Sequence, residues 1–510
     1  MMCWLLLSLL SGCWLSPKVE TGPRPNVLVV MWDTVRADRM SLYGHSRKTT
    51  PALERWAEDA QVFEHAVSPA MWTVPAHASL FTGLMPTSHG STAEWIWLDG
   101  YHQTLAEQFG QAGYATWAYS SNPYLSDRTN LLQGFDTIEM SWRGHLSTKT
   151  GEHTMGKLDP HDASVEMGPA WDSFYKGRSW PEHLTMHKDG SGVGVEAFTE
   201  WLDAREEDAE PFFAYLNFLE AHHPRIPTRE ARERILTPEE VKAGYATEAS
   251  LFRTMAAMER INTFLPEELE AMRGVYDAAL LELDDATHVL FEALKARGLE
   301  EDTLVVLVSD HGEHLGERRM FDHRWSLYEP LVHVPLIIKW PGHVPAGRTT
   351  DTVSTLDVFG TLFSLTGVGA PEGVPLGDLM GVAPERVHSE LAVPMPRHGA
   401  IRKAYPDLPR ATWQTRYHAM YEKGWKLLRL SSGKHELYDL NADPTEQRDW
   451  RQREFKKVRE MNGVAQQWRD GLPAYDLSRR GEDDQPKPAL SKTDPERQRL
   501  EALGYVEGDP

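Results

Sequence analysis

Short apolar runs that are rich in β-branched residues recur along this chain and constrain its fold more than any other feature. A continuous apolar run of this length is typical of a strand buried on both faces of a sheet. The runs span residues 26–32, 114–120, 211–219, 303–309 and 334–339. We therefore expect an internal sheet built from strands that are far apart in the sequence.

Segments with helical periodicity separate these runs. Between Glu267 and Arg297 the apolar residues recur at spacings of three and four, and Gly298 is placed to end a helix. Strands that alternate with helices predict an α/β fold with a doubly wound, mostly parallel central sheet. Ligands bind such sheets beyond the carboxyl ends of the strands, where Asp33 and Asp310 each directly follow a run.

The pattern divides the chain into a main domain over residues 26–385 and a smaller C-terminal subdomain and tail over 386–510. Two stretches of the main domain, about 141–190 and 225–265, are rich in Gly, Pro, His and charge, and we interpret them as irregular insertions that rim a site. Short strands at 418–421, 426–430 and 436–438, then a helix over 454–469, predict an antiparallel sheet, and 470–497 predicts an extended tail.

The N-terminus predicts export. Residues 1–17 carry no charge, and the apolar run from Trp4 to Leu10 suits a signal peptide but is too short to span a bilayer. Residues 10–13 resemble a bacterial lipobox, and 18–25 form a polar linker. We expect an exported, periplasmic or cell-envelope protein whose only membrane attachment is a lipid on Cys13. The alternative is an ordinary secretory signal or a misassigned start, which the missing Lys/Arg region favours.

Charge and cysteine content exclude several classes. The 510 residues include 53 Lys and Arg against 75 Asp and Glu, a net charge of −22, so we expect no nucleic-acid partner, which would need an extended basic surface. A single site can still be locally positive and bind an anion. Because Cys3 and Cys13 are the only cysteines, the chain beyond them has no disulfide, thiolate zinc site or cysteine nucleophile.

Asp33, Asp310 and His311 form a plausible site for one divalent cation, since all three follow predicted strands. An Asp-His-Gly triplet taken alone is more often a loop with a capping aspartate. Thr73 lies near the start of a helix predicted over 76–82, with Pro75 suited to its first turn. There the free N–H groups favour an anion. Thr73 is either a nucleophile that a metal activates or simply the N-cap.

Motifs along nearly the whole chain resemble those of the sulfatase family, within the alkaline phosphatase superfamily. The resemblance is carried by residues 25–33, 36–38, 50–53, 72–83, 89–90, 309–313, 327–336, 436–444 and 503–506. It implies that residues 26–385 are a sulfatase-like catalytic domain. It places Thr73 at the nucleophile position and implies that Asp33, Thr73, Asp310 and His311 hold one divalent metal ion. Zinc or manganese is favoured by the His ligand, and magnesium or calcium is possible.

Further histidines take roles by the same resemblance. His77 is expected to orient or polarise the nucleophile, and His222 and His323 to contact the anionic group or protonate the leaving oxygen. A second metal ion remains open, with Glu220, His222, His223 and His323 as candidate ligands.

Three departures from the family pattern bear on mechanism. Sulfatases use a cysteine or serine that is oxidised to formylglycine, whereas Thr73 cannot form that aldehyde because its β-carbon carries a methyl group. Thr34 stands where the family commonly has a second ligand aspartate. A lysine motif that binds sulfate in many members is also absent, and residues 120–123 occupy its region.

These observations predict a metal-dependent hydrolase of sulfate or phosphate esters. Thr73 favours phosphoester or phosphodiester hydrolysis through a covalent threonine intermediate, on a small molecule, glycan or lipid head group. Two alternatives are a phosphotransferase that acts on envelope lipid or glycan, and a non-catalytic family member that binds an anionic glycan. The first usually carries several membrane spans, and the second would not need Thr73 and the three ligands together.

Overall fold

The first apolar run forms strand β1 (Asn26–Trp32) in the middle of a large sheet. It pairs in parallel with β5 (Phe212–Phe218) on one side and β6 (Thr303–Val308) on the other. The structure is a computed structural model that describes residues 24–157, 190–206, 208–394, 403–407, 414–481 and 484. The predicted signal peptide, the lipobox and most of the linker lie outside the described residues.

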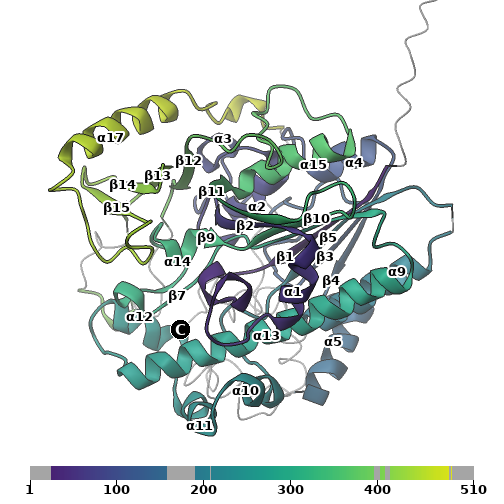
Figure 1. The fold of residues 1–510 in the computed structure, drawn as a ribbon, viewed down its shortest axis with the longest axis horizontal. Helices are drawn as coiled ribbons and strands as arrows, with labels where there is room; N and C mark the ends of the chain where they lie inside the picture. Colours follow the sequence, from purple (N-terminus) through teal and green to yellow (C-terminus); the bar gives the residue numbers. More distant parts are fainter. Residues whose placement is uncertain are drawn as a thin grey trace, which may run out of the picture.

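The sheet extends on both sides of this centre in the order β11-β2-β10-β6-β1-β5-β3-β4 (Figure 1). β3 (Ala115–Ser120) and β4 (Thr137–Met140) continue the parallel pairing. β10 (Leu336–Lys339) runs antiparallel to β6 and to β2 (Gln61–Val67), β11 (Gly347–Ser354) is parallel to β2, and the short β9 (His333–Val334) also pairs with β2. The predicted mostly parallel α/β sheet is confirmed. The strands β2, β4 and β11 were not predicted.

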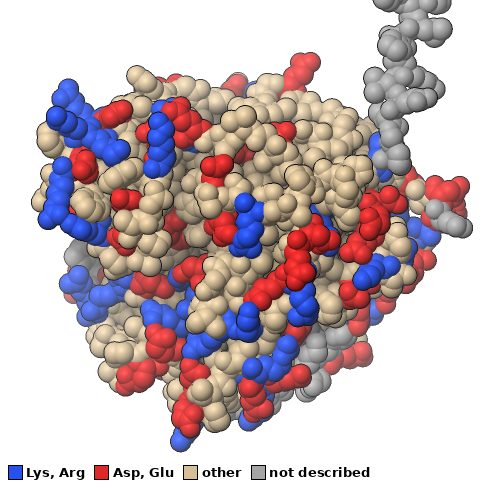
Figure 2. Space-filling view, in the orientation of Figure 1, with Lys and Arg blue, Asp and Glu red and all other residues tan. Residues whose placement is uncertain are grey.

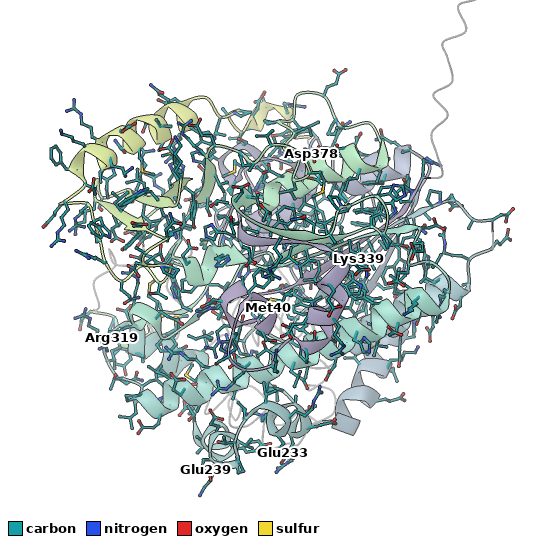
Figure 3. The ribbon with its side chains drawn as sticks, in the orientation of Figure 1. Met40, Glu233, Glu239, Arg319, Lys339 and Asp378 are labelled. Atoms are coloured by element: carbon teal, nitrogen blue, oxygen red, sulfur yellow. The ribbon has the colours of Figure 1, made fainter. Side chains whose placement is uncertain are left out.

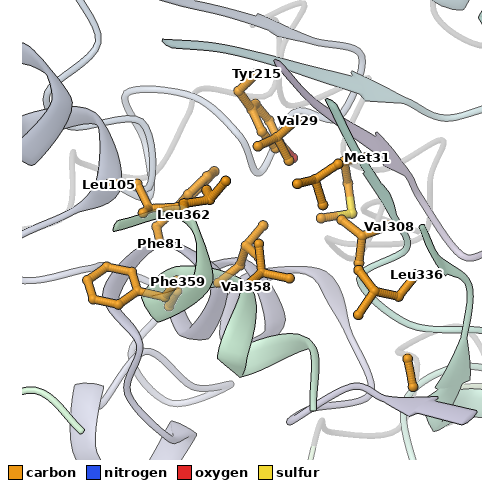
Figure 4. Packing of buried hydrophobic residues seen from close by; sticks show 14 of the residues in the cluster. Val29, Met31, Phe81, Leu105, Tyr215, Val308, Leu336, Val358, Phe359 and Leu362 are labelled. Atoms are coloured by element: carbon orange, nitrogen blue, oxygen red, sulfur yellow. The ribbon is translucent and has the colours of Figure 1, made fainter. Parts of the chain in front are cut away.

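Alternate residues of β1 supply two cores, one on each face of the sheet. Val29 and Met31 pack with α2 (Thr73–Thr82), α4 (Leu105–Gln111) and α15 (Val358–Thr366). Figure 4 shows Val29 next to Tyr215 and Met31 next to Val308 in this core. Leu28 and Val30 face the opposite layer, which contains α1 (Pro51–Trp56), α9 (Gly190–Asp203) and the long α13 (Pro266–Ala296). Helices on both faces are the doubly wound arrangement.

The described part of the two insertions is helical, so the prediction of irregular structure is wrong there. Residues 144–157 form α5 (Gly144–Lys157), and the second stretch contains α10 (Arg229–Ile235), α11 (Pro238–Ala246) and α12 (Leu251–Met258). Thr228, Thr237 and Ser250 precede the last three helices, and each side chain accepts a backbone N–H of the first turn. Such caps satisfy backbone N–H groups at the start of a helix and stabilise it. Residues 158–189 lie outside the described part.

A second sheet holds four antiparallel strands, as predicted for the C-terminal subdomain. They follow the order β12 (Val387–Leu391), β13 (Tyr417–Glu422), β14 (Trp425–Leu430) and β15 (His435–Asp439), and α17 (Phe455–Asp470) packs on them. The first strand, β12, was not predicted. A buried ion pair joins this sheet to the main one, since Lys426 Nζ on β14 lies 2.8 Å from Glu329 Oε1 at the start of α14 (Glu329–Val332).

The remaining elements are short and connect the layers. They are α3 (Pro86–His89), β7 (His314–Leu315), β8 (Phe321–Asp322) and 3₁₀ turns at Ala37–Arg39, Ser41–Tyr43, Ala57–Asp59, Glu317–Arg319, Thr355–Asp357 and Leu477–Arg479. In Figure 3 the charged ends of Glu233 and Glu239 lie at the periphery, whereas Met40 lies in the interior.

The described part of the tail returns to the main domain. Arg480 Nε donates to Asp99 Oδ1 at 3.0 Å, and the indole N–H of Trp97 donates to Asp484 at 2.6 Å. Over the described residues, none of the helices combines the length and apolar character that crossing a bilayer requires.

Candidate active site

Asp33 and Asp310 lie side by side because their strands are neighbours in register. Met31 of β1 is paired with Val308 of β6, and each aspartate follows two residues later. Asp33 is fully buried and Asp310 is 3% exposed. Two carboxylates from distant parts of the chain therefore meet beyond the carboxyl ends of neighbouring parallel strands, where such sheets bind ligands (the strand-end rule).

His311 completes a group that fits a cation. One ligand atom from each of Asp33, Asp310 and His311 lies within 4.8 Å of the other two. The Nδ1–H of His311 donates to the carbonyl of Gly312 at 3.0 Å, so the Nε2 lone pair of the neutral ring faces Asp310 Oδ2 at 3.2 Å. Two acceptors this close need a proton or a metal ion between them.

The unsatisfied atoms of the site point to the same conclusion. Asp33 Oδ1, Asp310 Oδ2 and His311 Nε2 are buried and have no hydrogen-bond partner among the described residues. Burial, and then the charge of Asp310, raises the pKa of Asp33 to about 8. Burial alone would lower the pKa of His311, but the carboxylate of Asp310 raises it to about 9. The donor set fits one divalent cation, which would offset two buried carboxylates.

Thr34, the residue after Asp33, contributes its backbone. Its N–H donates to Asp310 Oδ1 at 3.2 Å, while its hydroxyl donates to the carbonyl of Asp33 at 2.7 Å. The residue has a φ of 59°, which a β-branched side chain rarely adopts. The hydroxyl of Tyr276 donates to the Thr34 carbonyl at 2.7 Å and holds the turn. Local strain of this kind is common at functional sites.

Thr73 is the first residue of α2, and Trp72 takes the N-cap position, so the alternative of Thr73 as N-cap is wrong. Its side chain is fully buried. The amide of Asn122 donates to Asp33 Oδ2 at 2.8 Å and to Thr73 Oγ1 at 3.4 Å. The Thr73 hydroxyl is therefore linked to the cation-binding group through one amide, at a helix N-terminus whose N–H groups favour negative charge.

His77 contacts the backbone of Thr73. Its Nδ1–H donates to the Thr73 carbonyl at 2.8 Å, one helical turn away, and its Nε2 accepts from the hydroxyl of Tyr215 at 2.7 Å. Burial lowers the pKa of His77, which keeps the ring neutral and fits this proton arrangement. The geometry allows His77 to position the nucleophile, as predicted, through the main chain.

His222 and His323 lie beside the cation-binding group. The ring centroid of His323 is 4.4 Å from that of His311 and 5.1 Å from that of His222. His222 donates its Nδ1–H to the carbonyl of His223 at 2.5 Å, and burial followed by His323 holds the pKa of His222 well below its usual value. The structure thus brings both predicted histidines to one side of the site.

The predicted ligands for a second metal ion do not converge as a set. Glu220 Oε1 accepts the backbone N–H and the hydroxyl of Ser191 at 2.8 and 2.7 Å. His323 instead groups with Glu313 and Asp322. Arginines already neutralise those carboxylates: Arg225 lies 2.6 Å from Glu313, and Arg324 pairs with Asp322.

Asn122, Asn217 and Tyr215 were not predicted as site residues. Asn217 Nδ2 lies 3.4 Å from Asp33 Oδ2, and Tyr215 binds His77. Asn217 is on β5 and Asn122 follows β3. The strand-end rule that identified Asp33 applies equally to these two asparagines.

Known proteins that resemble this chain in sequence are sulfatases. Residues 25–368 match the family described as Sulfatase, and residues 316–467 match the family described as N-sulphoglucosamine sulphohydrolase, C-terminal. The chain is 26% identical to an ulvan-active sulfatase of Formosa agariphila, over 83% of this chain and 76% of that protein. It is 24% identical to an N-acetylglucosamine-6-O-sulfatase of Bacteroides thetaiotaomicron, over 84% and 83%.

Solved structures share the fold. The phosphonate monoester hydrolase of Agrobacterium radiobacter superimposes with a TM-score of 0.64 at 21% identity, covering 88% of this chain and 95% of that one. A second phosphonate monoester hydrolase, from Silicibacter pomeroyi, also gives 0.64 at 19% identity, with coverages of 89% and 96%.

Proposed function

The chain belongs to the sulfatase family and is a sulfuric or phosphoric ester hydrolase, and from this premise we propose that Thr73 itself attacks a phosphate monoester or phosphodiester. One observation carries the proposal: Thr73 is the first residue of α2, and the side-chain amide of Asn122 donates both to the Thr73 hydroxyl and to the Asp33 carboxylate. Because a threonine cannot become formylglycine, the hydroxyl is the nucleophile that this position offers.

Asp33, Asp310 and His311 would hold the cation. When bound, a divalent cation supplies positive charge that favours the alkoxide of Thr73 and offsets the charge of the ester. Zinc or manganese suits two carboxylates and an imidazole, and magnesium or calcium is the alternative. Asn122 orients the nucleophile. The free N–H groups at the N-terminus of α2 stabilise the oxygens of the ester group.

The first half-reaction forms a phosphothreonine. The hydroxyl of Thr73 loses its proton to water, the bond from Oγ to phosphorus forms, and the bond to the leaving alcohol breaks. His323 gives that alcohol its proton. In the second half a water attacks phosphorus and returns a proton to His323. The bond to Thr73 Oγ then breaks, and Oγ takes up a proton from solvent.

His222 has a narrower role in this scheme. Its Nδ1–H is held by the carbonyl of His223, so the neutral ring offers a lone pair at Nε2. A lone pair can accept a proton but repels an oxyanion. We therefore assign His222 to proton exchange on the leaving-group side, next to His323, and not to contact with the anionic group.

A sulfate ester is the second candidate substrate, because the relatives that match over most of this chain are named sulfatases. Hydrolysis would then proceed without the aldehyde, through the same hydroxyl.

The deciding experiment assays an aryl sulfate, an aryl phosphate monoester and an aryl phosphodiester with zinc, manganese, magnesium or calcium. Mass spectrometry of rapidly quenched enzyme tests for a modified Thr73. Turnover of a phosphorus ester with a phosphothreonine supports the proposal, whereas turnover of the sulfate alone supports the second candidate. Product formed only when an acceptor alcohol is added would indicate a transferase. Substrate binding with no turnover at all would indicate a non-catalytic family member.

A further inference from the structure

A ladder of polar side chains crosses the C-terminal sheet. The register pairs Glu390 of β12 with His418 of β13, His418 with Arg429 of β14, and Arg429 with His435 of β15. Residues directly opposite one another in an antiparallel sheet lie on the same face, so all four side chains share one face. Four polar residues in one row are unusual for a face that a helix partly covers, and they call for a reason.

Helix α17 covers only part of this face. Met420 and Leu427, each two residues from a ladder member, pack against Met461 and Ala465 of the helix. The polar row borders a cavity of about 340 Å³ that extends from the strands to the C-terminal end of α17. The helix therefore seals the apolar end of the sheet and leaves the polar end open.

Three arginines line this cavity: Arg416, Arg429 and Arg469. Among the described residues, no carboxylate oxygen lies within 4.0 Å of any of their guanidinium groups. Of the described residues that line the cavity, only Glu390 is acidic, and it accepts the N–H and hydroxyl of Thr87 at 3.1 and 2.8 Å. The cavity is thus a concentration of unpaired positive charge.

The surrounding subdomain is also basic. Residues 414–481 carry 14 Lys and Arg against 10 Asp and Glu, in a chain whose net charge is −22. Figure 2 shows Lys and Arg side chains gathered over this subdomain, at the upper left. An anion that is repelled by most of the molecule would be attracted here.

His418, which lines the cavity, adds no charge to it. A guanidinium can only donate, so Arg429 donates to His418 Nδ1 at 3.3 Å, and the Nε2–H of His418 then donates to His388 Nδ1 at 3.0 Å. Burial, followed by His388 and Arg429, keeps the pKa of His418 well below its usual value. The ring of His388 stacks on Trp468 with centroids 3.6 Å apart, and His418 also stacks on Trp468 at 5.0 Å, which holds the two histidines together.

Arg429 has bonding capacity that the protein leaves unused. Its Nε is buried and has no hydrogen-bond partner among the described residues. Burial, and then the charge of Arg469, lowers the pKa of Arg429. A buried N–H without an acceptor is costly, and an anion in the cavity would satisfy it.

We propose that this cavity is an accessory site for a sulfate or phosphate group carried by the substrate, separate from the ester cleaved at Thr73. Guanidinium forks match the oxygens of such groups, and three arginines supply several donors. The inference rests on the proposed function in taking the ligand to be an anionic ester. The substrate would therefore carry at least two anionic groups.

The wall of the cavity lies close to the segment that carries Thr73. The backbone N–H of Glu390, in the cavity wall, donates to the carbonyl of Pro69 at 2.8 Å. Pro69 precedes Thr73 by four residues, and four extended residues span at most about 14 Å. A substrate of a few sugar units, or a comparable chain, is long enough to connect them.

The test uses a matched pair of substrates: an activated aryl phosphodiester with, and without, a second phosphate on its alcohol. Arg429→Gln and Arg469→Gln should raise KM at least about tenfold for the doubly anionic substrate and leave the singly anionic one unchanged. Arg429→Lys keeps the charge but loses the fork, so its effect should be intermediate. The control is Arg459→Gln, because Arg459 is exposed and lies on α17 together with Arg469.

A titration with inorganic sulfate, followed by tryptophan fluorescence, separates the possible outcomes. Binding that Arg429→Gln abolishes, together with the KM effect, supports the accessory site. Binding of sulfate without any KM effect would mean that the cavity holds a free ion and would overturn the assignment to substrate. No binding and no KM effect would overturn the site altogether. If neither ester is cleaved, the proposed function fails, while the titration still tests the cavity.

Discussion

The side-chain amide of Asn122 lies 2.8 Å from a carboxylate oxygen of Asp33 and donates a hydrogen bond to it. The same nitrogen is 3.4 Å from the hydroxyl of Thr73. One side chain therefore sets the position of a predicted metal ligand relative to a predicted nucleophile. Its removal should affect both.

Asn122→Ala should lower the activity by about ten- to a hundredfold, the usual cost of losing a group that orients a ligand. Metal affinity, measured by competition with a chelator, should fall with it. Asn122→Asp should be worse, because it adds a third carboxylate to a buried site that already holds Asp33 and Asp310. Wild-type metal affinity and rate in both variants would show that the amide orients neither group.

Thr73→Ala should abolish turnover of an aryl phosphodiester and leave thermal unfolding close to wild type, since the Thr73 side chain does not cap α2. Thr73→Ser keeps the hydroxyl and should retain part of the activity. The measurement is the rate of phosphodiester cleavage by each variant, with the metal content of each protein sample determined in parallel. Substantial activity in Thr73→Ala protein with full metal would remove Thr73 from the mechanism.

Asp310→Asn should reduce metal occupancy, measured by elemental analysis of purified protein, because it removes one of two carboxylates in the group. Asp302→Asn is the matched control, since Asp302 directly precedes the same strand at its other end and is exposed. Equal occupancy in the two variants would move the cation away from the strand ends.

His89 should make stability depend on pH in acid. Its Nδ1 accepts the N–H of Ser91 at 3.0 Å and its Nε2 contacts Ser79 at 3.1 Å, while burial and then His102 lower the pKa of His89 to about 3. An unfolded histidine titrates near 6.5, so between about pH 6.5 and 3 the unfolded state binds more protons. The free energy of unfolding should fall as pH falls through this window, by at most about 1.4 kcal/mol per pH unit for this group.

Urea unfolding at several pH values measures that slope. His89→Asn keeps an acceptor toward Ser91 but cannot take up a proton, so its slope should be smaller than that of wild type. The same slope in both proteins would assign the acid sensitivity to other groups.

Gly83→Ala should destabilise the fold by about 2–4 kcal/mol, the sum of a left-handed backbone and a steric overlap. Gly83 ends α2 with a φ of 68°, and a Cβ there would lie 2.5 Å from Phe359. Gly298 has the same φ with nothing within 4 Å, so Gly298→Ala measures the backbone cost alone. The difference between the two unfolding free energies isolates the overlap, and equal losses would mean that Phe359 moves aside freely.

The strand ends explain how much of the site could be predicted. Asp33 and Asp310 follow continuous apolar runs, and the register of a parallel sheet is enough to bring them together. Asn122 and Asn217 obey the same rule, but an asparagine does not attract attention as a ligand or a nucleophile. The sequence indicated the residue types that do chemistry and missed the two asparagines that contact Asp33.

The strands toward one side of the sheet were predicted less well, for a physical reason. β2 carries Glu64 and His65, and β11 begins with polar residues, because strands at the side of a sheet are only partly buried. Their sequences therefore lack the continuous apolar run of β1. For the helices over 229–258, one signal that the sequence did offer was the threonine or serine before each one.

The ion pair between Lys426 and Glu329 limits how the two parts of the chain can be exchanged. The Lys426 side chain is fully buried and also lies 2.7 Å from Glu446, itself fully buried. A protein cut before β12 would keep Glu329 and lose its counter-charge, at a cost of about 3–5 kcal/mol. A chimera that joins this main domain to a foreign C-terminal subdomain should thus fold only if the foreign part supplies a lysine and a carboxylate at the positions of Lys426 and Glu446. The buried ionic triad therefore limits where this chain can be recombined.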